Sequence, residues 1–169
     1  MRPVVFNIPN QYNGFMHKIS EITSFLIAPC GMNCGVCSAY LRERKPCTGC
    51  NGDDAQKSST HCATCRIKHC ENLKNITSGL CVDCSKFPCA RIKHIDKRYQ
   101  TKYGMSMIEN LETIQSLGMN AFVKQERSRW QCSKCGGVLC VHRDVCPSCG
   151  RKYKKKSYNL SPKVRRPHM

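Results

Sequence analysis

Two pairs of cysteines near the C-terminus are spaced to bind a metal ion. Cys132 and Cys135 form one C-x-x-C pair, and Cys146 and Cys149 form the other after ten intervening residues. Each such turn places two sulfur atoms on one side of a tetrahedron, the geometry that zinc prefers. A glycine follows each pair, where the turn often needs a positive φ angle. The pattern predicts a structural zinc ribbon, because four thiolates leave no open coordination position for catalysis.

A richer array of cysteines lies upstream, where residues 30–89 contain eleven of the sixteen cysteines. Its C-x-x-C pairs predict two further four-thiolate sites: Cys34 and Cys37 with Cys47 and Cys50, and Cys62 and Cys65 with Cys81 and Cys84. Cys70 can readily take the place of Cys62 in the second of these sites. The remaining cysteines, Cys30, Cys70 and Cys89, form a further site if His61, His69 or His94 completes it. We expect three zinc ions, or four with that site.

The identity of the metal in the upstream array stays open at this level. Cysteine spacing does not by itself separate zinc from iron, so an iron–sulfur cluster in residues 30–89 is the alternative. Cys140 and His142 lie between the two ribbon turns. We interpret Cys140 as a small buried hydrophobe and His142 as an ordinary packed or surface histidine.

A disulfide scaffold is the competing explanation for so many cysteines. The N-terminus has no long apolar run and no small-residue cleavage site, so it does not read as a secretory signal. The longest apolar patch, residues 25–29, is far too short to cross a membrane. We therefore expect a cytoplasmic protein without a membrane partner, in which the thiols stay reduced and bind metals.

Only the region after Cys89 has the apolar periodicity of helices. Pro88 is suited to open a helix whose apolar face carries Ile92, Ile95 and Tyr99. Ser106 and Glu109 form a capping box that starts a second helix, which we expect to end at Gly118. A third short helix is expected over residues 120–127.

These elements predict a small metal-stabilised α+β fold with five segments. Residues 1–29 are a lead-in and 30–89 a loop-rich multi-cysteine domain. Residues 90–128 are a helical segment packed on that domain, 129–150 the zinc ribbon and 151–169 a flexible basic tail. With so thin an apolar core apart from cysteine, we expect the chain to need cross-links or metals to fold.

Basic residues give the chain a formal net charge of +17. One cluster is expected on a single side of the first helix: Arg91, Lys93, Lys97 and Arg98. The other lies in the tail: Lys152, Lys154, Lys155, Lys156, Arg165 and Arg166. Tyr153 and Tyr158 interleave with the tail cluster and are suited to stack on bases. The pattern predicts contacts with RNA or DNA, with a solvated helix face and a solubilising tail as the plainer interpretation.

Several separated motifs resemble one prokaryotic family. They are Ala28-Pro-Cys-Gly-Met-Asn-Cys-Gly-Val-Cys37, Cys47-Thr-Gly-Cys50 and Phe87-Pro-Cys-Ala-Arg-Ile-Lys93. The family consists of cysteine-rich proteins catalogued only as a domain of unknown function. The resemblance implies a small cytosolic zinc-binding protein, and it supplies no reaction, substrate or catalytic residue.

The leading functional hypothesis is a non-enzymatic nucleic-acid-binding module. The alternatives are an adaptor that presents rigid metal-held loops to a protein partner, and an iron–sulfur or thiol redox protein. The sequence contains no acid/base pair, phosphate-binding glycine loop or nucleophile triad that would carry catalysis.

Overall fold

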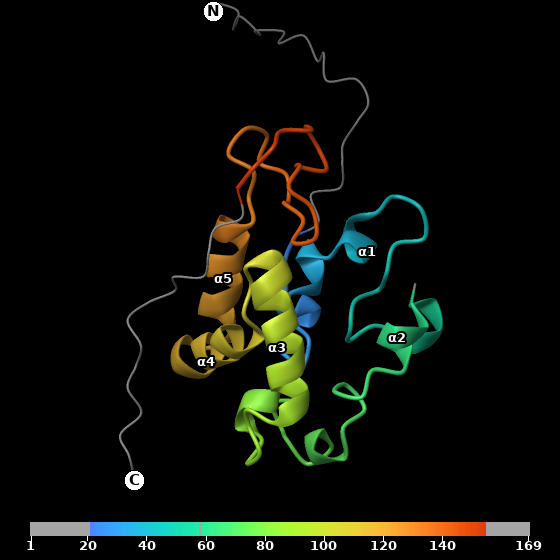
Figure 1. Ribbon diagram of the computed structural model, residues 1–169, viewed down its shortest axis with the longest axis vertical. Coiled ribbons are helices and arrows are strands. Elements are labelled where there is room, and N and C mark those ends of the chain that lie inside the picture. Colours follow the sequence, from blue (N-terminus) through green and yellow to red (C-terminus); the bar gives the residue numbers. More distant parts are fainter. Residues whose placement is uncertain (1–20, 58, 155–169) are drawn as a thin grey trace, which may run out of the picture.

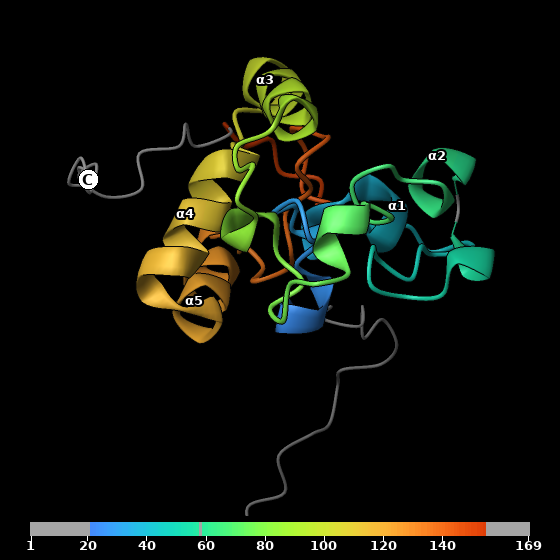
Figure 2. The same cartoon turned by 90° about the horizontal axis from the view of Figure 1, so that it is seen from below.

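The computed structural model of the chain describes residues 21–57 and 59–154. Three helices dominate it: α3 (Ala90–Tyr103), α4 (Met107–Leu117) and α5 (Met119–Arg129). Helix α4 packs against both α3 and α5. Figures 1 and 2 show these helices on one side and the loops that carry α1 (Ser38–Leu41) and α2 (Thr60–Ala63) on the other. The rest of the described chain is loop, with five single-turn 3₁₀ helices at 24–26, 34–36, 54–56, 71–73 and 81–83.

The expected α+β class is corrected by the backbone pairing. Within the described residues, extended segments pair only at three isolated bridges: Ile27 with Asn33, Gln131 with Val138, and Val145 with Lys152. The segments between cysteines turn back after too few residues to build a ladder, so no strand forms in this part of the chain. The structure is helical and loop-rich.

The three predicted helices are confirmed close to their expected bounds. Ser106 caps α4, and its hydroxyl accepts a 3.0 Å hydrogen bond from the amide of Glu109. Gly118 ends α4 at a φ of +83°. On α3, Ile92 is fully buried, while Ile95 and Tyr99 are half-buried. Local signals were sufficient here because caps and apolar periodicity act within one helix.

The side chain of Asp96 connects α3 to the start of α4. It is 5% exposed, and its Oδ1 accepts hydrogen bonds from the Met107 amide at 2.7 Å and the Ile108 amide at 3.1 Å. The same oxygen accepts a 2.8 Å bond from the Ser106 hydroxyl. A carboxylate at this position satisfies amides that the first helical turn leaves unpaired and faces the positive end of the helix dipole. It therefore fixes the angle between α3 and α4.

The segment from residue 22 to residue 36 lies at the centre of the core. Figure 2 shows it between the helices and the loops. Gly31 has a φ of +84°, and a Cβ at this position would lie 2.7 Å from the Met107 carbonyl oxygen. The Gly31 carbonyl in turn accepts a 2.7 Å bond from the buried Asn110 side chain. This close approach packs the first cysteine loop directly on α4, so the helices position the cysteines.

Candidate metal centre

Four sulfur atoms converge in the C-terminal cysteine module, which we define as residues 130–154. The Sγ atoms of Cys132, Cys135, Cys146 and Cys149 all lie within 4.8 Å of one another. Cys132 and Cys149 are 3.8 Å apart, and Cys135 and Cys146 are 3.7 Å apart. A tetrahedral zinc ion with Zn–S bonds of about 2.3 Å requires its sulfurs to be about 3.8 Å apart. The predicted ligands are thus brought together at the spacing of a single-ion site.

The backbone around the cluster has two similar turns. The amide of Gly136 donates to the Cys132 carbonyl at 2.8 Å, and the amide of Gly150 donates to the Cys146 carbonyl at 3.0 Å. Both glycines have positive φ, +73° and +68°. The left-handed conformation closes each turn, and it explains why a glycine follows each C-x-x-C pair.

Backbone amides donate hydrogen bonds to sulfur atoms of this cluster and stabilise the thiolate form that binds a cation. The amides of Cys135 and Lys134 donate to the Cys132 sulfur and lower the pKa of that thiol to about 6. For Cys135, the Gly137 amide favours the thiolate, but the neighbouring thiols of Cys149 and Cys146 raise its pKa to about 12. Crowded thiolates repel one another, so the cluster reaches its fully ionised form when a cation shares the charge. The donor set fits a bound metal ion.

The module docks on the rest of the chain and begins inside the core. Trp130 is 4% exposed, and its ring nitrogen donates a 2.9 Å bond to the Glu126 carboxylate. Val141 is fully buried, and its amide donates a 2.8 Å bond to the Val36 carbonyl. His142 is confirmed as a packed histidine: its Nδ1 accepts from the Ser38 amide at 3.2 Å, and its Nε2 is 3.3 Å from the Tyr99 hydroxyl.

The first tail residues belong to this module by their contacts. The amide of Tyr153 donates to the Asp144 carbonyl at 2.8 Å, and Lys152 bridges to Val145. The half-buried Tyr153 donates its hydroxyl to the carbonyls of Cys140 and Arg143. Tyr153 therefore has a packing role, whereas we expected it to stack on bases. Residues 155–169, including Tyr158, lie outside the described residues.

The upstream cysteines are gathered less tightly. Over residues 21–57 and 59–154, the C-terminal cluster is the only group of three or more metal-ligating atoms within 4.8 Å of one another. All sixteen cysteines lie in these ranges, and none forms a disulfide. The grouping of Cys34, Cys37, Cys47 and Cys50 and that of Cys62, Cys65, Cys81 and Cys84 stay predictions.

Cys34 and Cys50 approach each other most directly within the upstream array. The Cys50 amide donates to the Cys34 sulfur at 3.3 Å. A hydrogen bond between the two thiols raises the pKa of Cys34 and lowers that of Cys50 to about 7. Burial raises the pKa of Cys30, and the charges of Cys50, Cys81 and Cys65 raise it further. Cys30 therefore lies within the electrostatic reach of three other upstream cysteines.

A second neighbourhood surrounds Cys81. Burial raises the pKa of Cys81 to about 12, and the charges of Cys89, Cys70 and Cys84 contribute to the rise. The Cys84 amide donates to the Cys81 carbonyl at 3.2 Å, so the two form one turn. Cys65 also acts on Cys81, so the choice between Cys62 and Cys70 as the partner of Cys65, Cys81 and Cys84 stays a prediction.

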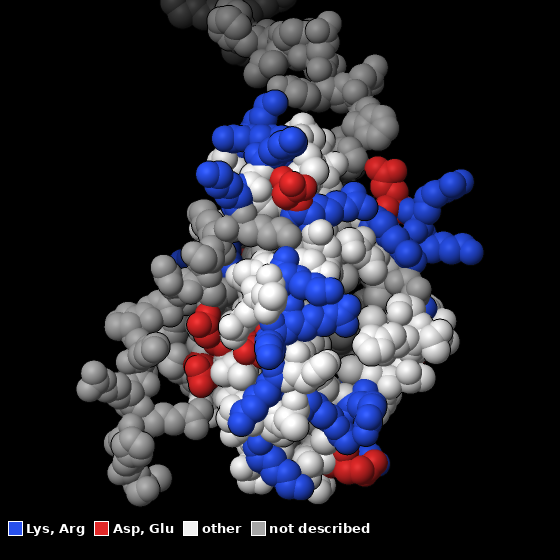
Figure 3. Space-filling model, viewed as in Figure 1, with Lys and Arg blue, Asp and Glu red and all other residues white. Residues whose placement is uncertain are grey.

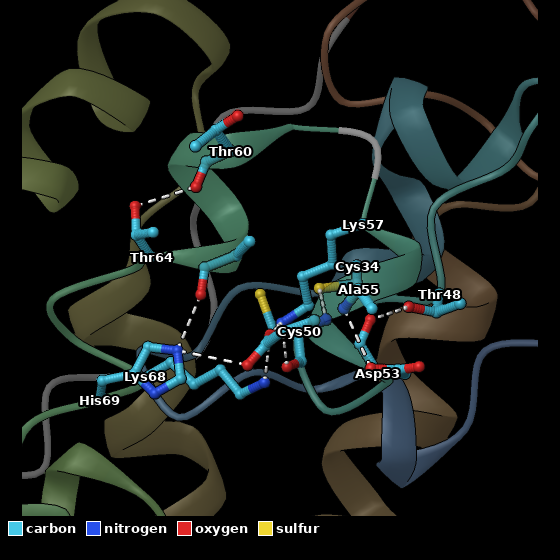
Figure 4. A network of polar contacts seen from close by, with 12 residues as sticks. Cys34, Thr48, Cys50, Asp53, Ala55, Lys57, Thr60, Thr64, Lys68 and His69 are labelled. Atoms are coloured by element: carbon cyan, nitrogen blue, oxygen red, sulfur yellow. Dashed lines mark hydrogen bonds and ion pairs between the residues drawn. The ribbon is translucent and has the colours of Figure 1, made fainter.

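Lysine ammonium groups lie beside Cys50, a feature that cysteine spacing did not reveal. Figure 4 shows Lys57 and Lys68 converging on this loop. The Lys57 side chain is 0% exposed, donates to the Cys50 carbonyl at 2.9 Å and forms an ion pair with Asp54. Lys68 reaches the same carboxylate at 2.6 Å. Both cations favour the Cys50 thiolate. The signal in the sequence was only a pair of lysines among the cysteines.

The three candidate histidines, His61, His69 and His94, are exposed. His69 Nε2 lies 2.8 Å from the Ala63 carbonyl and 3.4 Å from Asp54. None of the three joins a group of ligating atoms within 4.8 Å in the described ranges.

The basic residues predicted to contact nucleic acid lie on the surface. Arg91, Lys93, Lys97 and Arg98 are all exposed on α3, and so are Lys152 and Lys154 in the C-terminal module. Figure 3 shows lysine and arginine side chains gathered over α3 and over the module above it. Lys155, Lys156, Arg165 and Arg166 lie outside the described residues. No helix in the described ranges is both long and apolar enough to span a membrane.

Comparison with known proteins finds a family model that matches part of the chain. Residues 26–94 match the family model described as a protein of unknown function, DUF3795. This match confirms the resemblance drawn from the cysteine motifs and covers the first cysteine loop through the start of α3. No curated protein and no solved structure matched the chain significantly. Together with the C-terminal cluster, the family match describes a cysteine-rich protein with a site able to bind a metal ion.

Proposed function

We propose that this protein is a zinc-dependent, non-enzymatic module that binds nucleic acid through its phosphates. Zinc holds the C-terminal module as a ribbon and cross-links the upstream loops, and the helices present a basic surface. The observation that carries the proposal is the charge on α3. Its five lysine and arginine side chains, Arg91, Lys93, Lys97, Arg98 and Lys102, are exposed, while its single acid, Asp96, is 5% exposed.

Sulfur spacing supports zinc at the C-terminal cluster. A sulfur–sulfur distance of 3.7–3.8 Å suits one tetrahedral ion, and an iron–sulfur cluster of several atoms holds its thiolates further apart. A closed four-thiolate site exposes no coordination position to a substrate, so the ion supplies folding energy rather than chemistry.

The surface of α3 suits a polyanion. Cations spread over one helix with no exposed acid between them produce a positive potential that attracts phosphates. The side chain of Arg91 is partly immobilised, because its Nη1 donates a 2.9 Å hydrogen bond to the Arg66 carbonyl. Lys93 and Lys97 lie one turn apart on α3, Arg98 follows Lys97, and the three side chains form the core of the proposed contact. Phosphate contacts of this kind position a strand without reading its sequence.

A hollow beside the metal cluster extends the basic surface. Its volume is about 290 Å³, and its walls include Arg151, Lys152, Lys154 and the half-buried Tyr153. The backbone bond of Tyr153 to Asp144 anchors these cations to the loop before Cys146, which zinc would hold in place. Preorganised cations lose less freedom on binding than those of an unstructured segment. We propose that this hollow holds a phosphate of the same strand.

The test is a salt titration of binding to fluorescent single-stranded RNA and DNA. Elemental analysis of the anaerobically purified chain comes first and should give zinc without iron. The variant Lys93→Gln/Lys97→Gln/Arg98→Gln should bind more weakly, and its slope of log K against log salt should be shallower by about 2 if three phosphate contacts are lost.

Matched controls separate this surface from total charge. The variant Arg44→Gln/Lys74→Gln/Lys124→Gln removes the same charge from exposed positions away from α3 and should keep the wild-type slope. A chain ending after Lys154 keeps the contacts of Tyr153 and measures the contribution of residues 155–169. Equal slopes for both triple variants, or no wild-type binding near physiological salt, would overturn the proposal. A protein partner that survives nuclease and high salt would favour the adaptor alternative.

A further inference from the structure

One backbone hydrogen bond brings two distant cysteines to the same place. The Val141 amide donates to the Val36 carbonyl at 2.8 Å, across 105 residues of chain. Cys37 follows Val36, and Cys140 precedes Val141. The bond therefore joins the first cysteine loop to the C-terminal module with a cysteine on each side. His142 continues the contact by accepting from the Ser38 amide at 3.2 Å.

A third cysteine reaches this junction through α1. The Cys47 amide donates to the Ala39 carbonyl at 2.9 Å, which folds the loop after α1 back toward Cys37. The two backbone bonds thus hold the loops that carry Cys37, Cys47 and Cys140 at one junction between the upstream array and the C-terminal module. A metal ion bound there by thiolates would join the two parts of the chain.

We infer that Cys37, Cys47 and Cys140 bind a metal ion that joins the C-terminal module to the upstream cysteine array, with one further upstream cysteine as the fourth ligand. This inference rests on the proposed zinc binding, and it departs from the interpretation of Cys140 as a buried hydrophobe. The sulfurs lie further apart than those of the C-terminal cluster, so the ion draws the loops together as it binds.

The number of cysteines supports a ligand role for Cys140. Eleven cysteines lie in residues 30–89, and three four-thiolate sites require twelve. Cys140 supplies the twelfth, and no histidine is then needed. His142 is adjacent but its two ring nitrogens already face Ser38 and Tyr99. The nine remaining upstream cysteines then supply the fourth ligand of this site and the eight ligands of two other sites.

Burial of Cys140 is consistent with a ligand held in a closed site. It is 1% exposed, and its carbonyl accepts the Tyr153 hydroxyl. A small hydrophobe at this position would be replaceable by alanine or valine at modest cost. A thiolate ligand would not, because its loss leaves three thiolates around an ion or releases the ion altogether. This difference can be measured as metal content.

The direct experiment uses the full wild-type chain loaded with ¹¹³Cd²⁺. A heteronuclear correlation spectrum should show one cadmium signal coupled to the β-protons of Cys37, Cys47 and Cys140. Cadmium signals coupled only to other cysteines, with none on Cys140, would overturn the inference and leave the C-terminal site intact. An absence of any cadmium or zinc binding would instead overturn the proposed function.

Variants give an independent readout by zinc content per chain. Cys140→Ala and Cys37→Ala should each contain one zinc ion fewer than wild type. The double variant should also lack only one, because both residues hold the same ion. Val141→Ala is the control: it removes a neighbouring buried side chain and no sulfur, so it should keep the wild-type zinc content. Unchanged zinc content in Cys140→Ala would overturn the assignment. If Cys140→Ala fails to fold while Val141→Ala folds, the ¹¹³Cd²⁺ spectrum of the wild type decides.

Discussion

The side-chain amide of Asn33 donates a 2.8 Å hydrogen bond to the carboxylate of Glu126, and both residues are almost completely buried. Asn33 lies in the first cysteine loop and Glu126 on α5, 93 residues later. The same carboxylate oxygen accepts from the Trp130 ring nitrogen at 2.9 Å. Asn33 also accepts from the Gly35 amide at 3.0 Å, which shapes the turn between Cys34 and Cys37. A helix carboxylate thus holds the loop of a predicted metal site.

The first prediction concerns the charge on Glu126. Burial raises the pKa of this carboxyl, while Asn33 and the positive charge of Arg129 oppose the rise. The folded protein therefore holds the Glu126 proton more tightly than the unfolded chain. The resulting stabilisation is fully present below the unfolded pKa and is lost as pH rises through the folded pKa. Glu126→Gln keeps an acceptor and cannot ionise, so its stability relative to wild type should increase with pH over that window.

Urea unfolding at several pH values, at one fixed free zinc concentration, measures this difference. Zinc affinities of the two proteins, measured at each pH, correct the comparison for any difference in metal binding. Glu126→Ala is the contrasting variant. It leaves the buried donors of Asn33 and Trp130 without an acceptor, so it should lower the free energy of unfolding by about 3 kcal/mol. A stability difference between Glu126→Gln and wild type that is constant with pH would contradict the argument.

The second prediction compares two glycines with positive φ. Gly31 has a φ of +84°, and a Cβ there would lie 2.7 Å from the Met107 carbonyl oxygen and 2.8 Å from Leu111 Cγ. Gly79 has a φ of +66°, and nothing lies within 4 Å of its Cβ position. Alanine at either position is strained by the positive φ angle, at a cost of about 1–2 kcal/mol. Only Gly31→Ala also pushes α4 away from the cysteine loop.

We therefore expect Gly31→Ala to lose at least about 2 kcal/mol more stability than Gly79→Ala. The measurement is the urea midpoint of each zinc-loaded protein by circular dichroism. Similar losses for the two variants would mean that the contact of residue 31 with α4 contributes nothing.

The extent to which sequence patterns predict this molecule depends on the distance over which each interaction acts. Ser106 and Gly118 bound α4 because a cap and a helix stop operate within a few residues. The C-terminal cluster followed from two C-x-x-C turns for the same reason. The contacts of Val36 with Val141 and of Asp96 with α4 join segments that carry no matching local signal. The α+β class is not confirmed, because the described segments on either side of the cysteine turns pair only at isolated bridges, and strand pairing depends on contacts that the cysteine spacing does not encode.

The third prediction concerns protons released when the C-terminal cluster binds zinc. Cys135 has its pKa raised to about 12, so this thiol carries a proton at neutral pH before metal binds. The amides of Cys135 and Lys134 lower the pKa of Cys132 to about 6, so most of that residue is already thiolate. Zinc binds thiolates, and the Cys135 proton must leave. Zinc affinity at this site should therefore rise with pH, by about tenfold per unit for each proton displaced.

Calorimetric zinc titrations in buffers of different ionisation enthalpy count the released protons. Other cysteines also release protons, so the informative quantity is the difference between wild type and Cys135→Ser. That variant should bind one zinc ion fewer or more weakly and should release at least one proton fewer. Ser148→Ala changes a neighbouring exposed side chain without removing a sulfur and should match wild type. An equal proton count for wild type and Cys135→Ser would mean that Cys135 is already ionised in the metal-free cluster. In that case the mutual repulsion of the four sulfurs would be weaker than their separations of less than 4.8 Å imply.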